Sequence, residues 1–198
     1  MDLPLYVLDD PEPQRRDEND GERAHTWRYR GVGMAVGMTA DGDGTLEVTL
    51  DTRRKVTREV RRLRPEVIVA PDPSRLWSGN RYVNHSDHKA AGMLALSTVM
   101  PDAPTRVMFQ ELEAEGIEPF EVPNLWLSSN EPDTYVDISD TIDVKIKSLE
   151  QHVSQGGADA EPWVRLRAQQ TGEETGYPYA EAFKTFRFVD EPPAVEDE

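Results

Sequence analysis

An uninterrupted apolar run near the middle of the chain constrains the fold more than any other feature. The segment EVIVA, residues 66–70, in which the four residues after Glu66 are apolar, is followed at once by PDP, residues 71–73. A short continuous apolar run that ends at prolines is typical of a strand buried on both faces of a parallel sheet. Parallel strands require long crossover connections, usually helices. The run therefore predicts a layered fold in which helices alternate with strands.

Helical patterns flank this strand on both sides. The segment TLDTRRKVTREVRRLRP, residues 49–65, is mostly charged, and it predicts an amphipathic helix stopped by Pro65 with one apolar stripe, namely Leu50, Val56, Val60 and Leu63. A second helix is expected over residues 86–99, with Ser86 as its N-cap. Small residues at positions 90–92 favour close packing of this helix on the sheet.

The alternation continues downstream. We expect short strands at residues 107–109, 124–127 and 135–138, a helix that opens at Asp140 or Thr141, and a helix over residues 161–172 closed by Gly172. The later helical stripe comprises Ile142, Ile146, Leu149 and Val153, and the segment YAEAFKTFRF places Tyr179, Phe183 and Phe186 on one face. Trp126 and Trp163 are expected in the core. The fold class is therefore α/β, with a mostly parallel sheet.

Length and composition restrict the class of protein further. A chain of 198 residues suits one domain, which we expect over residues 42–188, between a poorly ordered or unrelated segment at residues 1–41 and an acidic tail at residues 189–198. The net charge of −16 argues against a nucleic-acid partner and leaves a high-salt cytoplasm open. No window approaches the roughly 18 to 20 apolar residues of a membrane span. Without cysteine or a secretory signal, the expected location is the cytoplasm.

The stretch NRYVNHSDHKAAG, residues 80–92, holds two of the four histidines. Ligands of α/β sheets bind beyond the carboxyl ends of the strands, so the candidate site lies between Val69 and His88. The positive end of a helix dipole favours the neutral, zinc-ligating form of His88. Asp87, between His85 and His88, is suited to accept a spare ring N–H. Catalytic zinc needs about three protein ligands, so a capped surface loop without metal remains the alternative.

These segments resemble ordered blocks of a known family. RPEVIVAPDP with YVNHSDHKAAG, DGTLEVTLDTRRKV (residues 43–56), YVDISDTIDVKIKSLEQHVSQ (residues 135–155) and RAQQTGEETGYPYAEAF (residues 167–183) are similar to the PIG-L/LmbE-like zinc-dependent N-deacetylases. The resemblance covers about residues 42–187. It implies a Rossmann-like fold and a hydrolase with one Zn²⁺ per chain that removes acetyl groups from N-acetylated amino sugars, such as N-acetylglucosamine derivatives, and related glycoconjugates.

Residue roles follow from the same resemblance. His88 corresponds to a zinc ligand, His85 to the histidine that stabilises the tetrahedral oxyanion and protonates the leaving amine, and Asp87 to the carboxylate that orients His85. The family's amino-terminal AHPDD motif, which completes the zinc site, does not occur in this chain. We therefore expect an amino-terminal strand and helix to be missing, through a truncated or frameshifted reading frame or in a short inactive relative. A catalytically inactive remnant or a sugar-binding module without zinc is the alternative function, and a homo-oligomer is left open.

Further residues are candidates for substrate binding, on the weaker grounds of position and resemblance. They are Asp43, Asp72, Arg75, Arg81, Tyr82 and His152. Each also has an ordinary structural explanation. Asp43 and Asp72 lie in turn-forming sequences, the loop residues before His85 suit a solvated loop, and a histidine near the end of a helix is favoured by the dipole.

Overall fold

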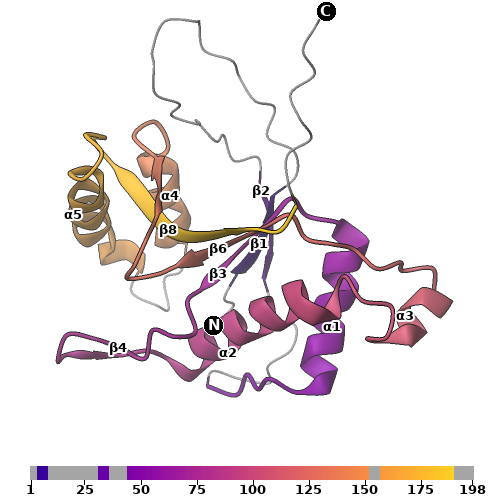
Figure 1. Ribbon diagram of the computed structural model, residues 1–198. Helices are drawn as coiled ribbons and strands as arrows, with labels where there is room; N and C mark the ends of the chain where they lie inside the picture. Colours follow the sequence, from indigo (N-terminus) through magenta and orange to yellow (C-terminus); the bar gives the residue numbers. More distant parts are fainter. Residues whose placement is uncertain (1–3, 9–30, 36–43, 152–156, 190–198) are drawn as a thin grey trace, which may run out of the picture. The chain divides into compact units, whose positions relative to one another are not determined.

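The computed structural model describes residues 4–8, 31–35, 44–151 and 157–189 (Figure 1). The described residues form two compact units. The first comprises residues 4–8, 31–35, 44–130 and 184–189, and the second comprises residues 131–151 and 157–183. Within the described ranges, no helix is long and apolar enough to cross a membrane. Most of the two terminal segments expected to be poorly ordered lies outside these ranges.

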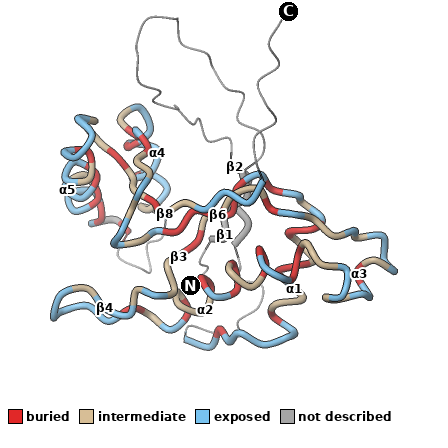
Figure 2. The backbone as a smooth tube through the Cα atoms, in the orientation of Figure 1, coloured by how far each residue is buried: buried red, intermediate tan, exposed pale blue. Residues whose placement is uncertain are grey.

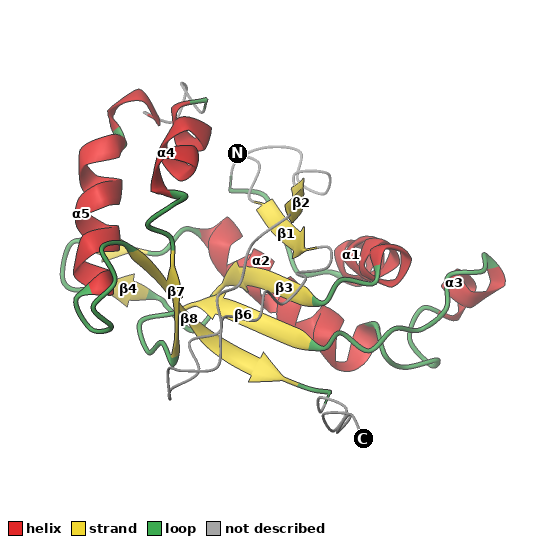
Figure 3. Ribbon diagram, turned by 90° about the horizontal axis from the view of Figure 1, so that it is seen from above, coloured by secondary structure: helices red, strands yellow, loops and turns green. Residues whose placement is uncertain are grey.

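A mixed sheet organises the first unit. Its strands are β1 (Pro4–Leu8), β2 (Gly31–Ala35), β3 (Val67–Pro71), β6 (Asn124–Ser128) and the second half of β8 (Ala180–Arg187), in the order β2-β1-β3-β6-β8. The predicted α/β layered fold is confirmed, and the strand predicted from EVIVA is β3. β3 and β6 pair in parallel across a helical crossover, as the parallel arrangement requires, and the flanking pairs are antiparallel (Figure 3).

The strand β1 lies directly beside β3. Its residues Tyr6, Val7 and Leu8 pair with Val69, Ile68 and Val67 in antiparallel register. This edge of β3 is therefore covered by a strand of the chain itself. The absence of a family-type amino-terminal strand and helix stays a prediction.

Helix α1 (Leu50–Leu63) lies within the segment predicted to be helical and ends before Pro65, as predicted. Thr49 and Thr52 form a reciprocal cap, because the Thr49 hydroxyl accepts from the Thr52 N–H at 3.1 Å and the Thr49 N–H donates to the Thr52 hydroxyl at 2.9 Å. The helix ends at Arg64, which has a φ of 49°, immediately before Pro65. The predicted stripe is right for Val56 and Val60, which are buried, and wrong for Leu50, which is 65% exposed.

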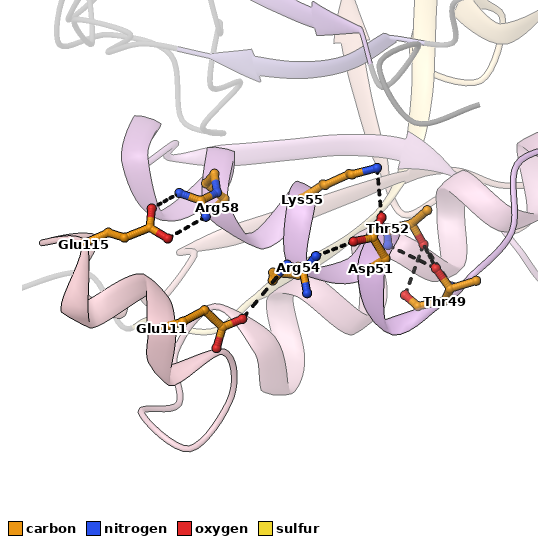
Figure 4. A network of polar contacts seen from close by, with 8 residues as sticks. All are labelled: Thr49, Asp51, Thr52, Arg54, Lys55, Arg58, Glu111 and Glu115. Carbon is orange, nitrogen blue, oxygen red and sulfur yellow. Dashed lines mark hydrogen bonds and ion pairs between the residues drawn. The ribbon is translucent and has the colours of Figure 1, made fainter. Parts of the chain in front are cut away.

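Ion pairs cover the exposed face of α1 (Figure 4). Asp51 in the first turn pairs with Arg54 and with Lys55, and the Lys55 Nζ lies 2.8 Å from the Asp51 carboxylate. Arg58 makes a two-pronged contact with Glu115, just beyond α3 (Gln110–Ala114). Exposed pairs of this kind contribute little individually, so the stability of α1 comes mainly from its buried face.

The core of the first unit lies between two helices and one face of the sheet. Helix α2 (Ser86–Ser97) and α1 pack their buried residues against Ile68 and Ala70 of β3 and Leu125 and Leu127 of β6. Figure 2 shows the buried stretches of these elements in red. Residues two apart in a strand share a face, which is why these strand residues meet the same helices. Trp126 faces the other side and is 5% exposed, as expected of a core residue.

The strand expected at residues 107–109 is wrong. A π-helical turn, Thr98–Asp102, follows α2, and residues 103–109 are an irregular loop that leads to α3. The side chain of Arg61, 2% exposed, donates from Nε to the Ala103 carbonyl at 3.1 Å and from Nη2 to the carbonyls of Asp102, Thr105 and Met108 at 2.8 to 3.0 Å. These bonds satisfy backbone groups that a strand ladder would otherwise engage.

The second unit contains two helices and a strand pair. Its elements are β7 (Thr134–Asp137), α4 (Ile142–Glu150), a 3₁₀ turn (Gly157–Asp159), α5 (Glu161–Gly172) and the first half of β8, which pairs with β7. The predicted bounds of α5 are confirmed, and Ile142 and Ile146 are buried as expected, whereas Val153 lies outside the described residues. Trp163 is 55% exposed, so its assignment to the core is wrong.

The aromatic residues near the carboxyl end do not share one face. They lie in or next to the strand β8, in which residues three apart point to opposite sides. Accordingly Phe183 is 8% exposed and Phe186 is 39% exposed. The prediction of one common face for Tyr179, Phe183 and Phe186 assumed a helical spacing, which the pairing of β8 with β6 and β7 overrides.

Candidate active site

The candidate site lies where β3 ends and α2 begins. After β3 the chain forms a hairpin of β4 (Trp77–Ser78) and β5 (Tyr82–Val83) and then enters α2. Gly92 fixes α2 against the end of β3, because a Cβ atom at this position would lie 2.4 Å from the Pro71 carbonyl oxygen. His88 is one turn before Gly92 and therefore on the same face of the helix. Both His85 and His88 are partly exposed.

His85 is the N-cap of α2. Its ring Nδ1 accepts the backbone N–H of Asp87 at 3.3 Å. The predicted cap, Ser86, is wrong, because Ser86 is the first helical residue and the imidazole takes the acceptor role usually filled by a hydroxyl or carboxylate. The centroids of the His85 and His88 rings are 5.7 Å apart, with a tilt of 50° between the ring planes.

His88 contacts a buried asparagine. The ring Nδ1 lies 3.2 Å from Oδ1 of Asn84, which is 6% exposed. Asn84 is itself held at two further points, since its Nδ2 donates to the Arg75 carbonyl at 2.7 Å and its Oδ1 accepts from the Tyr82 hydroxyl at 3.1 Å. A network therefore joins the hairpin to the first turn of α2.

Asp87 is buried, with 5% of its surface exposed, and its carboxylate binds backbone groups of another segment. Oδ2 accepts the Gly44 N–H at 2.7 Å, and Oδ1 accepts the Leu46 N–H at 3.2 Å. The Oδ2 atom is 4.0 Å from the His85 Nδ1. The carboxylate thus ties the segment before α1 to the start of α2, while the Asp87 backbone holds the His85 ring. Its predicted role as the group that orients and tunes His85 stays a prediction.

Asp72 lies just beyond β3, and a set of hydrogen bonds surrounds its carboxylate. Oδ1 accepts from the Ser74 N–H at 2.8 Å and the Ser74 hydroxyl at 2.6 Å, and Oδ2 accepts from the Ser129 hydroxyl at 2.6 Å. Burial alone would raise the pKa of Asp72, but the hydrogen bonds from Ser129 and Ser74, with the charge of Arg75, hold this pKa below its usual value. Asp72 therefore joins the loops that follow the two parallel strands.

The structure brings some of the predicted substrate-binding residues together and not others. Arg75 and Tyr82 belong to the Asn84 network, and the Arg75 guanidinium carbon lies 5.6 Å from the centre of the Tyr82 ring. Arg81 is exposed in the hairpin. Asp43 and His152 lie outside the described residues, and their predicted roles stay predictions.

The described residues fit a metal ion in part. His88 suits a ligand role, because a ligating histidine commonly has its other ring nitrogen bonded to a protein acceptor, as Nδ1 is bonded here to Asn84. Among the residues that the structure describes, however, no group of three or more His, Asp or Glu side chains is arranged to hold a metal ion. The described part of the chain therefore offers His88 as one candidate ligand rather than a set of three, and its predicted role as a zinc ligand stays a prediction.

The sequence analysis missed Asn84. No helical or strand period links it to His88, because Asn84 precedes the helix and only the turn at His85 brings its amide to the ring. The available signal was weak. An asparagine stands immediately before a pair of histidines, at the end of a segment too short to be a core strand.

Fold and site together define an α/β layered protein with a histidine pair and a buried aspartate at the carboxyl end of its central parallel strands. No protein-family model matches the chain. The chain is homologous to the diacetylchitobiose deacetylase of Thermococcus kodakarensis, with 30% identity over 148 residues, which are 72% of this chain and 53% of that protein. It thus spans about half the length of the curated relative that it matches.

Solved structures are also similar to this chain. The N,N'-diacetylchitobiose deacetylase from Pyrococcus horikoshii matches with a TM-score of 0.64 and 26% identity, over 78% of this chain and 58% of that one. The conserved protein TT1542 from Thermus thermophilus matches with a TM-score of 0.58 and 27% identity, over 79% and 67%. GalB, the 4-carboxy-2-hydroxymuconate hydratase from Pseudomonas putida, matches with a TM-score of 0.54 and 20% identity, over 75% and 63%, a likeness of fold alone.

Proposed function

We propose that the chain belongs to the PIG-L/LmbE-like deacetylases and carries part or all of a zinc-dependent site that removes the acetyl group from an N-acetylated amino sugar. The observation that carries the proposal is the pair of histidines at the start of α2, each held by a different partner, in a chain 30% identical to a diacetylchitobiose deacetylase. The likeness to a second deacetylase of known structure adds support.

Zinc is the metal that the resemblance implies, and imidazole is one of its usual ligands. His88 would bind it through Nε2, since Nδ1 is bonded to Asn84. When bound, a divalent ion supplies Lewis acidity toward the carbonyl oxygen of the acetyl group. The remaining ligands would have to come from residues other than the described histidine pair, because the described residues hold no group of three.

His85 is suited to the oxygen that gains charge in the reaction. Because its Nδ1 accepts the Asp87 N–H, the neutral ring carries its proton on Nε2 and is a hydrogen-bond donor there. A donor aimed at a developing oxyanion lowers the barrier of acyl transfer. The start of α2 adds the positive end of a helix dipole at the same place. Release of the amine requires a proton, which a histidine beside the site can supply.

The homologues and the loop before the histidines support a proposal for the substrate class. Arg75 and Arg81 provide hydrogen-bond donors, and Tyr82, whose hydroxyl donates to Asn84, provides an aromatic ring, which suits a sugar with hydroxyl and acetamide groups. We therefore expect the chain to act on an N-acetylglucosamine unit, free or in a short oligosaccharide. A strongly anionic polymer is a poor substrate for a chain of net charge −16.

Release of acetate tests the proposal. The purified chain is incubated with zinc, freed of excess metal and given N,N'-diacetylchitobiose or N-acetylglucosamine, and acetate is measured. We expect release by the wild-type chain and a loss of about 100-fold or more in the His88→Ala variant. Arg62→Ala, a substitution of an exposed residue of α1, serves as the control and should retain the wild-type rate. If the wild-type chain retains no zinc and releases no acetate, the chain is a non-catalytic remnant or a sugar-binding module.

A further inference from the structure

We propose that Asn84 is a positioning residue that holds His88 in a single tautomer, with the proton on Nδ1 and the lone pair on Nε2. The inference deepens the proposed function and rests on it for its chemical purpose, since Nε2 is the nitrogen through which His88 would bind zinc. Four observations support it, namely the burial of Asn84 and its contacts with Arg75, Tyr82 and His88.

The orientation of the Asn84 amide is determined by its neighbours. The group 2.7 Å from one end of the amide is the Arg75 carbonyl oxygen, which can only accept a hydrogen bond. That end must therefore be the NH₂ group. The opposite end is the carbonyl oxygen, which accepts from the Tyr82 hydroxyl at 3.1 Å. A reversed amide would place two oxygen atoms face to face in a site that is 6% exposed.

The His88 tautomer follows from that orientation. Oδ1 of Asn84 has no hydrogen to give, so the ring nitrogen 3.2 Å away must be the donor. In a neutral imidazole only one nitrogen carries a proton, so Nε2 has the lone pair. The backbone of Asn84 is also held, because its N–H donates to the Leu76 carbonyl at 2.9 Å. The acceptor is therefore fixed in place before any ligand arrives.

The two histidines receive opposite tautomers from adjacent parts of the chain. At His85 the partner of Nδ1 is a backbone N–H, so the proton is on Nε2, whereas at His88 the partner is a carbonyl oxygen, so the lone pair is on Nε2. One ring is thereby prepared as a hydrogen-bond donor and the other as a metal ligand. A metal ligand already in the required tautomer does not have to move a proton before it binds.

Nitrogen-15 NMR of the metal-free protein tests the inference directly. The chain has four histidines, so a long-range ¹H–¹⁵N correlation spectrum contains few ring signals, and His88→Gln identifies the signal of interest by its loss. At a pH where the ring is neutral, we expect the His88 spectrum to show a protonated Nδ1 and an unprotonated Nε2. A protonated Nε2, or averaged shifts that indicate exchange between the two tautomers, would overturn the inference.

Two variants separate positioning from general stability. Asn84→Ala removes the acceptor and should convert the single His88 tautomer into a mixture, with a loss of zinc affinity of roughly 10- to 100-fold. Tyr82→Phe removes the other donor to the same oxygen but leaves the Arg75 contact that orients the amide, so the His88 tautomer should not change. An unchanged tautomer in a folded Asn84→Ala protein overturns the inference. Should that variant fail to fold, the wild-type spectrum decides alone.

The tautomer of His88 and the release of acetate are measured separately, so failure of the inference about Asn84 can be told apart from failure of the proposed function. A His88 ring protonated on Nδ1 in a chain that releases no acetate supports the role of Asn84 and refutes the deacetylase activity. A His88 ring protonated on Nε2 in a chain that does release acetate refutes the role of Asn84 alone.

Discussion

Replacement of Gly92 by alanine tests how closely α2 must approach the sheet for the site to form. The added Cβ atom would lie 2.4 Å from the Pro71 carbonyl oxygen, 2.8 Å from Cδ of Pro73 and 3.0 Å from the Pro73 nitrogen. These are backbone and ring atoms, which cannot rotate away as the end of a long side chain can. Ordinary van der Waals contact begins at 3.4 Å, so the helix and the loop must separate by about 1 Å, the difference between 3.4 and 2.4 Å.

The expected effects on stability and on the site differ in size. Overpacking of this kind costs about 1–3 kcal/mol, and the better helix propensity of alanine offsets about 1 kcal/mol of that cost. The net loss in the free energy of unfolding should therefore be about 0–2 kcal/mol. His88 lies one turn before Gly92 on the same face and should move with the helix. A displacement of about 1 Å at a catalytic group can reduce the rate by roughly 100-fold.

Urea unfolding and acetate release measure the two effects on the same preparations. Met93→Ala is the matched control, because Met93 is the next residue of α2 and is 45% exposed, so its loss should change the unfolding free energy by at most about 0.5 kcal/mol. The reasoning is refuted if Gly92→Ala is as stable as the wild type and retains its activity. That result would mean that α2 and the loop at Pro71 can separate enough to admit a Cβ atom without disturbing the site.

Further substitutions test other parts of the structure. Arg61→Met should lower the unfolding free energy by about 3 kcal/mol, measured in urea, because it removes the side-chain donor from four backbone carbonyls, of which those of Ala103 and Thr105 also accept a backbone N–H. The pKa of Asp72 in the folded protein is below its ordinary value of 3.8, so the charged carboxylate stabilises the fold above that pH. The stability advantage of the wild type over Asp72→Asn should therefore shrink as the pH falls below about 4. Unfolding curves recorded between about pH 3 and 7 measure this change. Trp126→Ala should cost about 3–5 kcal/mol in thermal or urea unfolding and Trp163→Ala less than about 1 kcal/mol, since the former is 5% and the latter 55% exposed.

Local sequence patterns predicted those helices and strands whose first and last residues are determined by neighbouring residues in the sequence. The bounds of α1 follow from Thr49 and Thr52 at its start and from Pro65 after its end, all neighbours in sequence. The run VIVA needed no partner to be identified as a buried strand, because continuous apolar residues suit a central parallel strand. The position of His88 in the first turn of the next helix followed from a predicted helix start at Ser86, and it is correct although the cap is His85.

Long-range contacts decided the elements that the sequence did not predict correctly. The segment VMF, residues 107–109, has a strand-like composition, but Arg61, more than 40 residues earlier, binds the carbonyls around it. In β8, pairing with two other strands imposed a period of two on a segment whose aromatic residues are spaced for a helix. Asn84 was missed for a different reason, since its partners lie within nine residues but its role depends on the amide geometry at a turn.

Zinc binding by the isolated chain tests the central claim most directly. Isothermal titration of the metal-free protein with zinc should show one site per chain, and that binding should be lost in His88→Ala and retained in Arg62→Ala. Equal binding by the wild type and His88→Ala, or no specific binding by the folded wild-type chain, would contradict the account of His88 as a metal ligand at the carboxyl end of the sheet.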